Sequence, residues 1–265
     1  MKRARWVLFT DLDGTLLDAV TYRFDAARPG LEALRRAGIP VVASTSKTRA
    51  EMVPLMRSLG LRGPCVVENG GAIFEKGAAR PLGATGSRLL RGYALLKERA
   101  GGALRGFHEM SDAELSAETR LSLDEASRAR RREFDLPFSI LGKDGSLAAA
   151  LGAEARKLGL RISRGGRFYH LHGQSDKGKA LKIVLRRWRG RRAAAIGDSA
   201  NDLPMLKAAS LAFAVKTREE RHDPDLVSGV PQLRLIDRAG PEGWAIAVDQ
   251  LLAMSSVDRR PMKTK

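Results

Sequence analysis

Short apolar runs alternate with amphipathic stretches over the first part of the chain. Continuous apolar runs at residues 6–9, 39–43 and 65–68 each end in small polar residues, and helical patterns occupy 29–37 and 49–59 between them. Buried parallel strands read as such continuous runs, and strands that alternate with helices are typical of a parallel sheet. The pattern therefore predicts an α/β fold with a doubly wound, mostly parallel, Rossmann-like sheet.

The alternation is interrupted in the middle of the chain and then resumes. From about residue 80 to residue 173 we expect helices with short β pieces, among them a tight hairpin at Gly165-Gly166. Strands at 193–196 and 211–215 and a helix at 243–254 restore the first pattern. We therefore predict a discontinuous core domain and an α+β cap domain inserted into it. The expected bounds are 1–80 and 174–265 for the core, and 81–173 for the cap.

The composition excludes several classes of protein. Of the 265 residues 43% are hydrophobic, which is enough for a real core, and the single cysteine, Cys65, excludes an intrachain disulfide. There is no signal-peptide pattern and no apolar run of membrane-spanning length, so we expect a cytoplasmic protein with no membrane partner. The polar, basic residues 255–265 predict a mobile tail.

The charge balance narrows the choice of partner. A net charge of +17, from 47 Lys and Arg against 30 Asp and Glu, favours an anionic partner. Aromatic residues are only 5% of the chain and are not interleaved with basic ones, as a base-stacking surface requires, and no nucleic-acid-binding motif is recognisable. We therefore expect a small anionic substrate and keep nucleic-acid binding as a remote alternative. The oligomeric state is left open.

Two carboxylates directly follow the first predicted strand. Asp11 and Asp13 belong to the segment Phe9-Thr10-Asp11-Leu12-Asp13-Gly14-Thr15, in which Gly14 allows a sharp turn. Carboxylates at the end of a buried strand are costly unless they are paired, and the carboxyl edge of a parallel sheet is where such folds bind ligands. The plain alternative is an ordinary Asp-rich turn.

Three further motifs fall at strand ends or helix starts on the same expected edge. Thr45 follows the second strand, Lys177 begins a helix, and Asp198 and Asp202 follow the strand at 193–196. Each has a plain alternative, namely a capping hydroxyl, a solvated lysine or a capping aspartate. Together with Asp11, the two later aspartates carry three negative charges, which Lys177 and one divalent cation would balance. Repulsion between an uncompensated site and a phosphate would cost roughly 4 kcal/mol for each pair of unit charges at about 4 Å. We therefore predict a metal site, and oxygen ligands favour Mg²⁺.

The four motifs, in this order, resemble those of the haloacid dehalogenase superfamily of phosphatases, and the insert resembles a C2B-type cap. The resemblance implies that Asp11 attacks phosphorus to form an aspartyl-phosphate and that Asp13 is the general acid and base. It implies that Thr45 and Lys177 hold the phosphoryl oxygens. Mg²⁺ would be held by Asp11, the Asp13 carbonyl and Asp198, with Asp202 in or next to its shell.

Several stretches are also similar to the mannosyl-3-phosphoglycerate phosphatase family of this subclass. They are residues 45–49, 68–73 and 165–171, and residues 110–112 with 121–138. This resemblance implies a phosphorylated sugar-glycerate substrate, with glucosyl-3-phosphoglycerate or another sugar phosphate as the alternative. The residues expected to bind it are Ser46, Lys47, Glu68, Asn69, Gly165, Gly166, Arg167 and His170.

Plain alternatives remain for some of these residues, and one residue departs from the family pattern. Arg167 and His170 would otherwise form a solvated hairpin face, and Lys47 would pair with Glu51 along a helix. The resemblance leads us to expect glutamate at the position of Leu136, before Pro137 and Phe138, so specificity is open to change there.

Overall fold

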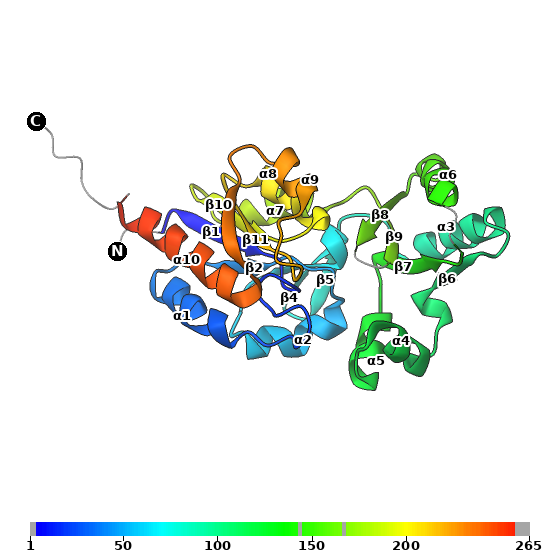
Figure 1. Ribbon diagram of the computed structural model, residues 1–265, viewed down its shortest axis with the longest axis horizontal. Helices are drawn as coiled ribbons and strands as arrows, with labels where there is room; N and C mark the ends of the chain where they lie inside the picture. Colours follow the sequence, from blue (N-terminus) through cyan, green and yellow to red (C-terminus); the bar gives the residue numbers. More distant parts are fainter. Residues whose placement is uncertain (1–3, 143–144, 166–167, 258–265) are drawn as a thin grey trace, which may run out of the picture. The chain divides into compact units, whose positions relative to one another are not determined.

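The computed structural model describes residues 4–142, 145–165 and 168–257 (Figure 1). The chain divides into two compact units. The first unit comprises Met1–Thr45, Leu59–Cys65 and Lys177–Lys265, and the second comprises Ser46–Ser58 and Val66–Asp176. The predicted domain bounds at residues 81 and 173 stay a prediction. Among the described residues, no helix is both long and apolar enough to cross a membrane.

The first unit is built on a five-stranded, entirely parallel sheet, which confirms the predicted fold class. The strand order is β12-β11-β10-β1-β2, and β1 and most of β10 are buried on both faces. The register pairs Thr10 of β1 with Ala43 of β2 and with Ile196 of β10, so these three strands end at one edge. The strands are β1 (Trp6–Thr10), β2 (Val41–Ala43), β10 (Arg192–Gly197), β11 (Leu211–Lys216) and β12 (Arg234–Ala239).

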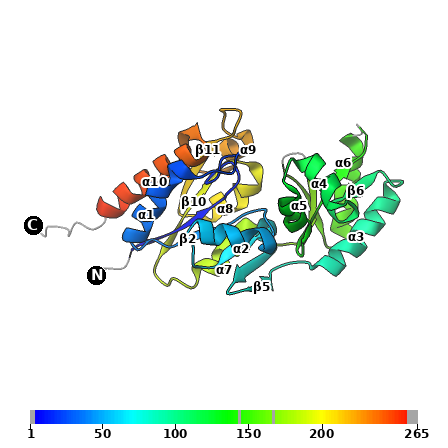
Figure 2. The ribbon, with the colours of Figure 1, turned by 90° about the horizontal axis from the view of Figure 1, so that it is seen from below.

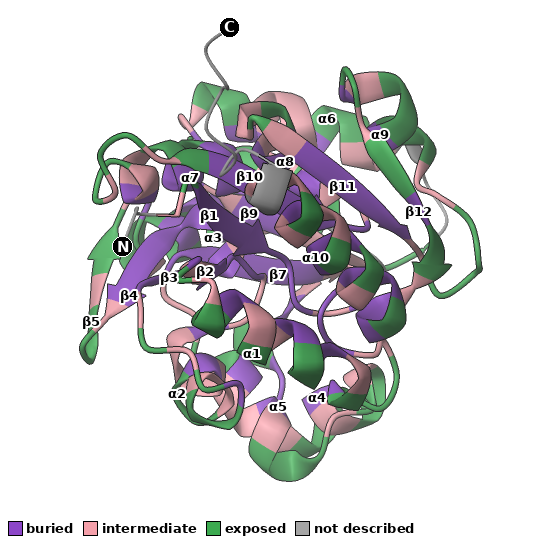
Figure 3. Ribbon diagram, turned by 90° about the vertical axis from the view of Figure 1, so that its left-hand side faces the viewer, coloured by how far each residue is buried: buried purple, intermediate pink, exposed green. Residues whose placement is uncertain are grey.

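Helices cover both faces of this sheet. Helix α10 packs against β10 and β11 beside α1, whereas α8 packs against the same two strands beside α7. Figure 2 shows α1 and α10 on one side of the strands and α7 on the other. The burial colouring in Figure 3 shows the strands between these helices as the buried layer. The helices are α1 (Arg28–Arg36), α7 (Lys177–Leu185), α8 (Leu203–Ala208), α9 (Pro224–Gly229) and α10 (Gly240–Val257), with short 3₁₀ turns at Asp25–Ala27 and Ala200–Asp202.

The second unit contains two smaller sheets. A three-stranded sheet has the order β3-β4-β5, and a four-stranded antiparallel sheet has the order β6-β7-β9-β8. The strands are β3 (Cys65–Val67), β4 (Ala72–Glu75), β5 (Ala78–Pro81), β6 (Leu104–Gly106), β7 (Asp135–Ile140), β8 (Arg161–Gly165) and β9 (Phe168–His172). The helices are α2 (Arg49–Ser58), α3 (Gly86–Arg99), α4 (Asp112–Thr119), α5 (Leu123–Arg130) and α6 (Gly145–Lys157), with 3₁₀ turns at Glu68–Gly70 and Phe107–Glu109.

The predicted hairpin around Gly165-Gly166 is present as β8 and β9, in which Gly165 pairs with Phe168. Gly166 and Arg167 lie outside the described residues, so their predicted contacts with substrate stay predictions. The predicted mobile tail is wrong at its start, because α10 runs through Val257 and therefore includes residues 255–257. The rest of that tail lies outside the described residues.

Strand β7 contains a proline, Pro137. A proline interrupts a ladder because it has no N–H to donate. Neighbour β6 pairs only with Phe138–Ile140 of β7, so at Pro137 the strand has a single neighbour, β9. The proline therefore sits where one side of the strand is unpaired.

Candidate active site

A buried lysine joins two carboxylates at the carboxyl edge of the five-stranded sheet. Asp11 directly follows β1, and its N–H donates to the carbonyl of Ile196, so the ladder holds its backbone. Lys177 is the first residue of α7, and only 1% of its surface is exposed. Its Nζ lies 2.6 Å from Asp11 Oδ1 and 2.7 Å from Asp202 Oδ1. The alternative of a solvated lysine is therefore wrong.

The loop after β10 is organised by Asp202. Its Oδ2 accepts from the N–H groups of Asp198 at 3.1 Å and Ser199 at 3.4 Å, so one carboxylate orients both the loop and Lys177. A Cβ on Gly197 would lie 2.6 Å from atoms of Asp202, which explains the glycine there. The hydroxyl of Thr15 donates to Asp198 Oδ1 at 2.7 Å. These groups come from three segments that are far apart in sequence, at residues 15, 177 and 197–202.

The three carboxylates form a group that fits a divalent cation. One oxygen each from Asp11, Asp198 and Asp202 lie within 4.8 Å of one another, and all three residues are buried. Burial and the charge of Asp202 raise the pKa of Asp11 to about 7. Burial and the charge of Asp11 raise the pKa of Asp198 well above its ordinary value. Lys177 alone does not balance three negative charges, and hard oxygen donors suit Mg²⁺.

The remaining predicted catalytic residues lie at the same edge. The N–H of Ser44 donates to the carbonyl of Thr10, which places Thr45 one residue further along, fully buried. Asp13 is half-buried in the turn after Asp11 and does not belong to the three-carboxylate group. Its roles as acid, base and carbonyl ligand stay predictions.

The carboxylate of Glu68, a predicted substrate-binding residue, is hydrogen-bonded to the backbone of its own unit. Glu68 is fully buried, and its carboxylate accepts from three consecutive N–H groups, those of Glu133, Phe134 and Asp135, at 2.8–3.2 Å. Burial raises its pKa to about 7. A Cβ on Gly71 would collide with the Cβ of Phe134, so the glycine lets this turn approach closely. A direct contact of Glu68 with substrate stays a prediction.

Asn69 and His170, also predicted to bind substrate, both contact the carboxylate of Asp135. Asn69 Nδ2 lies 2.8 Å from Asp135 Oδ2, and His170 Nδ1 lies 2.9 Å from the same oxygen. Asp135 had not been predicted as a site residue. No local pattern marks it, because its partners are 66 and 35 residues away.

Two more predicted residues belong to the same unit. Lys47 Nζ lies 3.9 Å from Glu51 Oε1, as the plain alternative expected, with both side chains largely buried. The carbonyl of Ser46 accepts from Arg132 Nη2 at 2.9 Å. Their contact with substrate, and that of Gly165, stay predictions.

Comparisons with known proteins agree with this geometry. The profile of the haloacid dehalogenase-like hydrolases matches residues 8–80 and 155–222. A protein of Methanococcoides burtonii named glucosyl-3-phosphoglycerate/mannosyl-3-phosphoglycerate phosphatase is 33% identical, over 94% of this chain and 98% of its own length. The chain belongs to the haloacid dehalogenase-like hydrolases. A second relative of this hydrolase, from Persephonella marina and with the same name, is 32% identical over 93% of this chain and 97% of its own.

Solved structures support the fold of this hydrolase. A haloacid dehalogenase-like hydrolase from Bacteroides thetaiotaomicron matches with a TM-score of 0.67 at 18% identity, covering 94% of this chain and all of that one. A sugar phosphatase of subclass IIB matches with a TM-score of 0.70, also at 18% identity, covering 92% and 98%. At this identity the likeness concerns the fold alone.

The hydrolase also has supporting residues that the sequence did not reveal. Trp244 of α10 is fully buried and donates from Nε1 to Thr10 Oγ1 at 2.9 Å. Thr10 Oγ1 in turn donates to the carbonyl of Asp11 at 2.7 Å. A tryptophan on an apolar helix face is no signal for this role. Thr15, by contrast, lies inside the first motif, so its role could have been predicted from the sequence.

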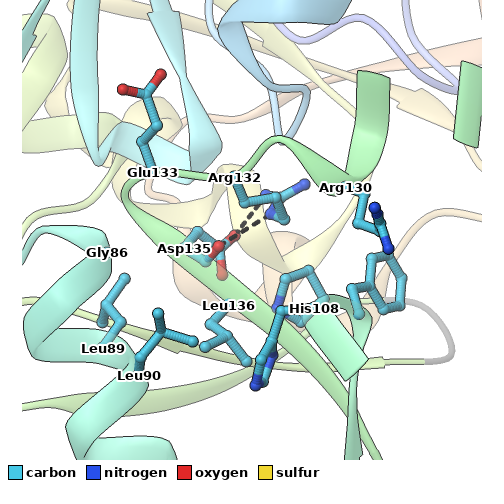
Figure 4. Close-up of a pocket in the computed structure, with 11 residues that line it drawn as sticks. Gly86, Leu89, Leu90, His108, Arg130, Arg132, Glu133, Asp135 and Leu136 are labelled. Carbon is cyan, nitrogen blue, oxygen red and sulfur yellow. Dashed lines mark hydrogen bonds and ion pairs between the residues drawn. The ribbon is translucent and has the colours of Figure 1, made fainter. Parts of the chain in front are cut away.

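The position that departs from the family pattern lies in the core of the second unit. Leu136 is 6% exposed and packs in a cluster with Phe138 and Leu171. It also lines a small pocket of about 90 Å³ that includes Leu89, Leu90, Phe107 and Arg132 (Figure 4). Successive residues of a strand point to opposite faces, so Leu136 points away from the face of Asp135. The pocket is also lined by the charged residues Arg130, Glu133 and Asp135.

Proposed function

We propose that this hydrolase is a Mg²⁺-dependent phosphatase that converts mannosyl-3-phosphoglycerate to mannosylglycerate and phosphate. The observation that carries the proposal is Lys177, buried between Asp11 and Asp202 beside Asp198 at the carboxyl edge of the sheet. The names of two relatives that match nearly the whole chain support the sugar-phosphoglycerate class. Because both names include it, glucosyl-3-phosphoglycerate is the second candidate substrate.

In the proposed reaction the chemistry on phosphorus belongs to Asp11 and Asp13. Lys177 fixes Oδ1 of Asp11, so we assign the attack to Oδ2. A bond forms from this oxygen to phosphorus while the bond from phosphorus to the glycerate oxygen breaks. Asp13 gives its proton to the leaving alkoxide and then takes one from a water molecule, which attacks phosphorus and releases Asp11 and phosphate.

The other groups hold the phosphoryl oxygens and balance charge. Lys177 and the hydroxyl of Thr45 donate to the equatorial oxygens of the transition state, where negative charge is spread. Thr15 and Asp202 keep Asp198 and Lys177 in place for this role. A Mg²⁺ ion held by Asp11, the Asp13 carbonyl and Asp198 would neutralise the phosphate and the carboxylates.

Phosphate release from a panel of esters tests this proposal. The panel contains mannosyl- and glucosyl-3-phosphoglycerate, mannose 6-phosphate and p-nitrophenyl phosphate, each with Mg²⁺ and with EDTA. We expect the highest kcat/KM on a sugar 3-phosphoglycerate and loss of turnover in EDTA. Equal kcat/KM on all four esters would contradict the substrate class, and full turnover in EDTA would contradict the metal.

A further inference from the structure

Asp135 has a buried carboxylate that contacts three polar side chains of the second unit. It is 1% exposed and begins β7. Its Oδ2 accepts from Asn69 Nδ2 at 2.8 Å and from Arg132 Nη2 at 3.0 Å. His170 Nδ1 lies 2.9 Å from Oδ2 and 3.1 Å from Oδ1. In Figure 4, Arg132 and Asp135 point toward each other.

The backbone of Asp135 is held as firmly as its side chain. Its N–H donates to Glu68 at 3.0 Å, and its carbonyl accepts from Arg132 Nε at 3.0 Å. Each polar group of the residue therefore has a partner within its own unit. A buried carboxylate with a full set of partners is rigid, so it can fix the side chains that contact it.

The charge state of Asp135 determines the proton position on His170. Burial opposes ionisation, but the charges of His170 and Arg132 outweigh it and hold the pKa of Asp135 well below its ordinary value. Because an ionised carboxylate only accepts hydrogen bonds, His170 Nδ1 must carry the proton. Nε2, on the other side of the ring, is then the nitrogen left to contact a ligand. The His170 side chain is 11% exposed, and within the described part of the chain Nε2 has no protein partner.

The sheet places these groups on its polar face. Asp135 pairs with His172, and Pro137 with His170, so these four residues share one face of β7 and β9. Leu136, Phe138 and Leu171 are on the other face, in the apolar core. A ring nitrogen held in a fixed orientation on a polar face suits recognition of a hydroxyl group.

We propose that Asp135 is a positioning residue for sugar recognition: it holds the His170 ring so that Nε2 forms a hydrogen bond with a sugar hydroxyl, a group that both donates and accepts. This inference rests on the proposed function. The residues assigned to phosphorus chemistry belong to the first unit, whereas Asp135 and its partners belong to the second. Changing Asp135 therefore alters the choice between esters more than the breaking of the phosphate bond.

The test compares Asp135→Asn with wild type on mannosyl-3-phosphoglycerate and on p-nitrophenyl phosphate, which has no sugar. The asparagine keeps the volume but removes the charge that holds the Nδ1 proton. We expect the ratio of kcat/KM values, sugar ester over p-nitrophenyl ester, to fall about tenfold, mainly through KM. Asp124→Asn makes the same chemical change at an exposed residue of α5 and should leave the ratio unchanged.

A double-mutant cycle with His170→Gln tests whether Asp135 acts through His170. We expect Asp135→Asn to lower the ratio little further once His170 is replaced. An undiminished fall in the His170→Gln background would overturn the proposal, as would an unchanged ratio in Asp135→Asn alone.

¹⁵N NMR of histidine-labelled protein tests the ring directly, with the His170 signals identified by their loss in His170→Gln. We expect Nδ1 to carry a proton in the wild type and to carry it less fully in Asp135→Asn. A wild-type ring with no proton on Nδ1 would overturn the inference even if substrate data agreed. If the wild type hydrolyses p-nitrophenyl phosphate but neither sugar 3-phosphoglycerate, the proposed substrate fails, while the NMR result still decides the role of Asp135.

Discussion

The ammonium group of Lys177 explains how a carboxylate-rich site is compatible with a folded core. Three buried aspartates would be costly without positive charge, and Lys177 contacts two of them at 2.6 and 2.7 Å. Burial lowers the pKa of Lys177, but the charges of Asp11 and Asp202 raise it by more. The pKa therefore lies above its ordinary value, and the ammonium group is charged at neutral pH. What remains is a net negative charge that a divalent ion would offset.

Asp11→Asn tests the assignment of the nucleophile. An amide is far less nucleophilic than a carboxylate, yet has the same shape, so we expect turnover to fall at least about 10³-fold with the fold intact. Phosphate release on the best ester and circular dichroism are the measurements. Asp249→Asn, at an exposed position of α10, is the matched control and should retain full activity. Substantial turnover by Asp11→Asn would remove Asp11 from this role.

At the scale of elements, two contacts join segments that the backbone alone would leave independent. Glu68 accepts from three successive N–H groups, the last of which belongs to the first residue of β7, and so fixes the start of that strand. Trp244 joins α10 to β1 through Thr10, next to Asp11. Both depend on a buried polar atom that finds its partner, and loss of such a partner costs more than the bond contributes.

The burial of Glu68 predicts a pH-dependent stability. Its pKa is raised from 4.5 to about 7 in the fold, so between these values the native state binds more protons than the unfolded state. This contribution is present in full below about pH 4.5 and is lost as pH rises through about 7. Glu68→Gln removes it, so the melting temperature should fall less between pH 5 and pH 8 in the variant than in the wild type. A fall in melting temperature of the same size in Glu68→Gln and in the wild type would contradict the prediction.

Trp244 predicts a large stability effect far from the motifs. Trp244→Ala empties a buried site and should cost about 3–5 kcal/mol of unfolding free energy. Trp244→Phe keeps most of the apolar contact but leaves Thr10 without its donor, and should cost about 1–2 kcal/mol. Urea unfolding measures both values. Trp188→Phe, at a half-buried position, is the control and should cost less. A Trp244→Phe variant as stable as wild type would show that the hydrogen bond to Thr10 contributes nothing.

At the scale of the whole molecule, segments from both ends of the sequence build the site. Residues near 11, 45, 177 and 198 meet because the carboxyl ends of the parallel strands meet at one edge. Any ion that binds only the folded arrangement therefore stabilises the whole first unit.

Added Mg²⁺ should raise the melting temperature. Binding at about 100 times the dissociation constant contributes about 2.7 kcal/mol to folding. We expect a higher melting temperature in Mg²⁺ than in EDTA for the wild type, and a much smaller difference for Asp198→Asn. An equal shift in both proteins would mean that the ion acts elsewhere.

Sequence pattern and motif order determined the fold class and the edge of the sheet at which the three aspartates meet. Apolar runs identified β1, β2, β10 and β11, and the rule that parallel strands end together predicted that Asp11, Lys177, Asp198 and Asp202 converge. The edge strands β12 and β5 were not predicted, because their mostly exposed residues carry little apolar pattern.

Only the tertiary structure decided which polar atoms pair. The bonds from Trp244 to Thr10 and from Asn69 to Asp135 span 234 and 66 residues. Periodicity reports which face of an element is buried. Packing of distant segments decides which group lies within hydrogen-bonding distance of another, so these partners became visible only in the folded chain.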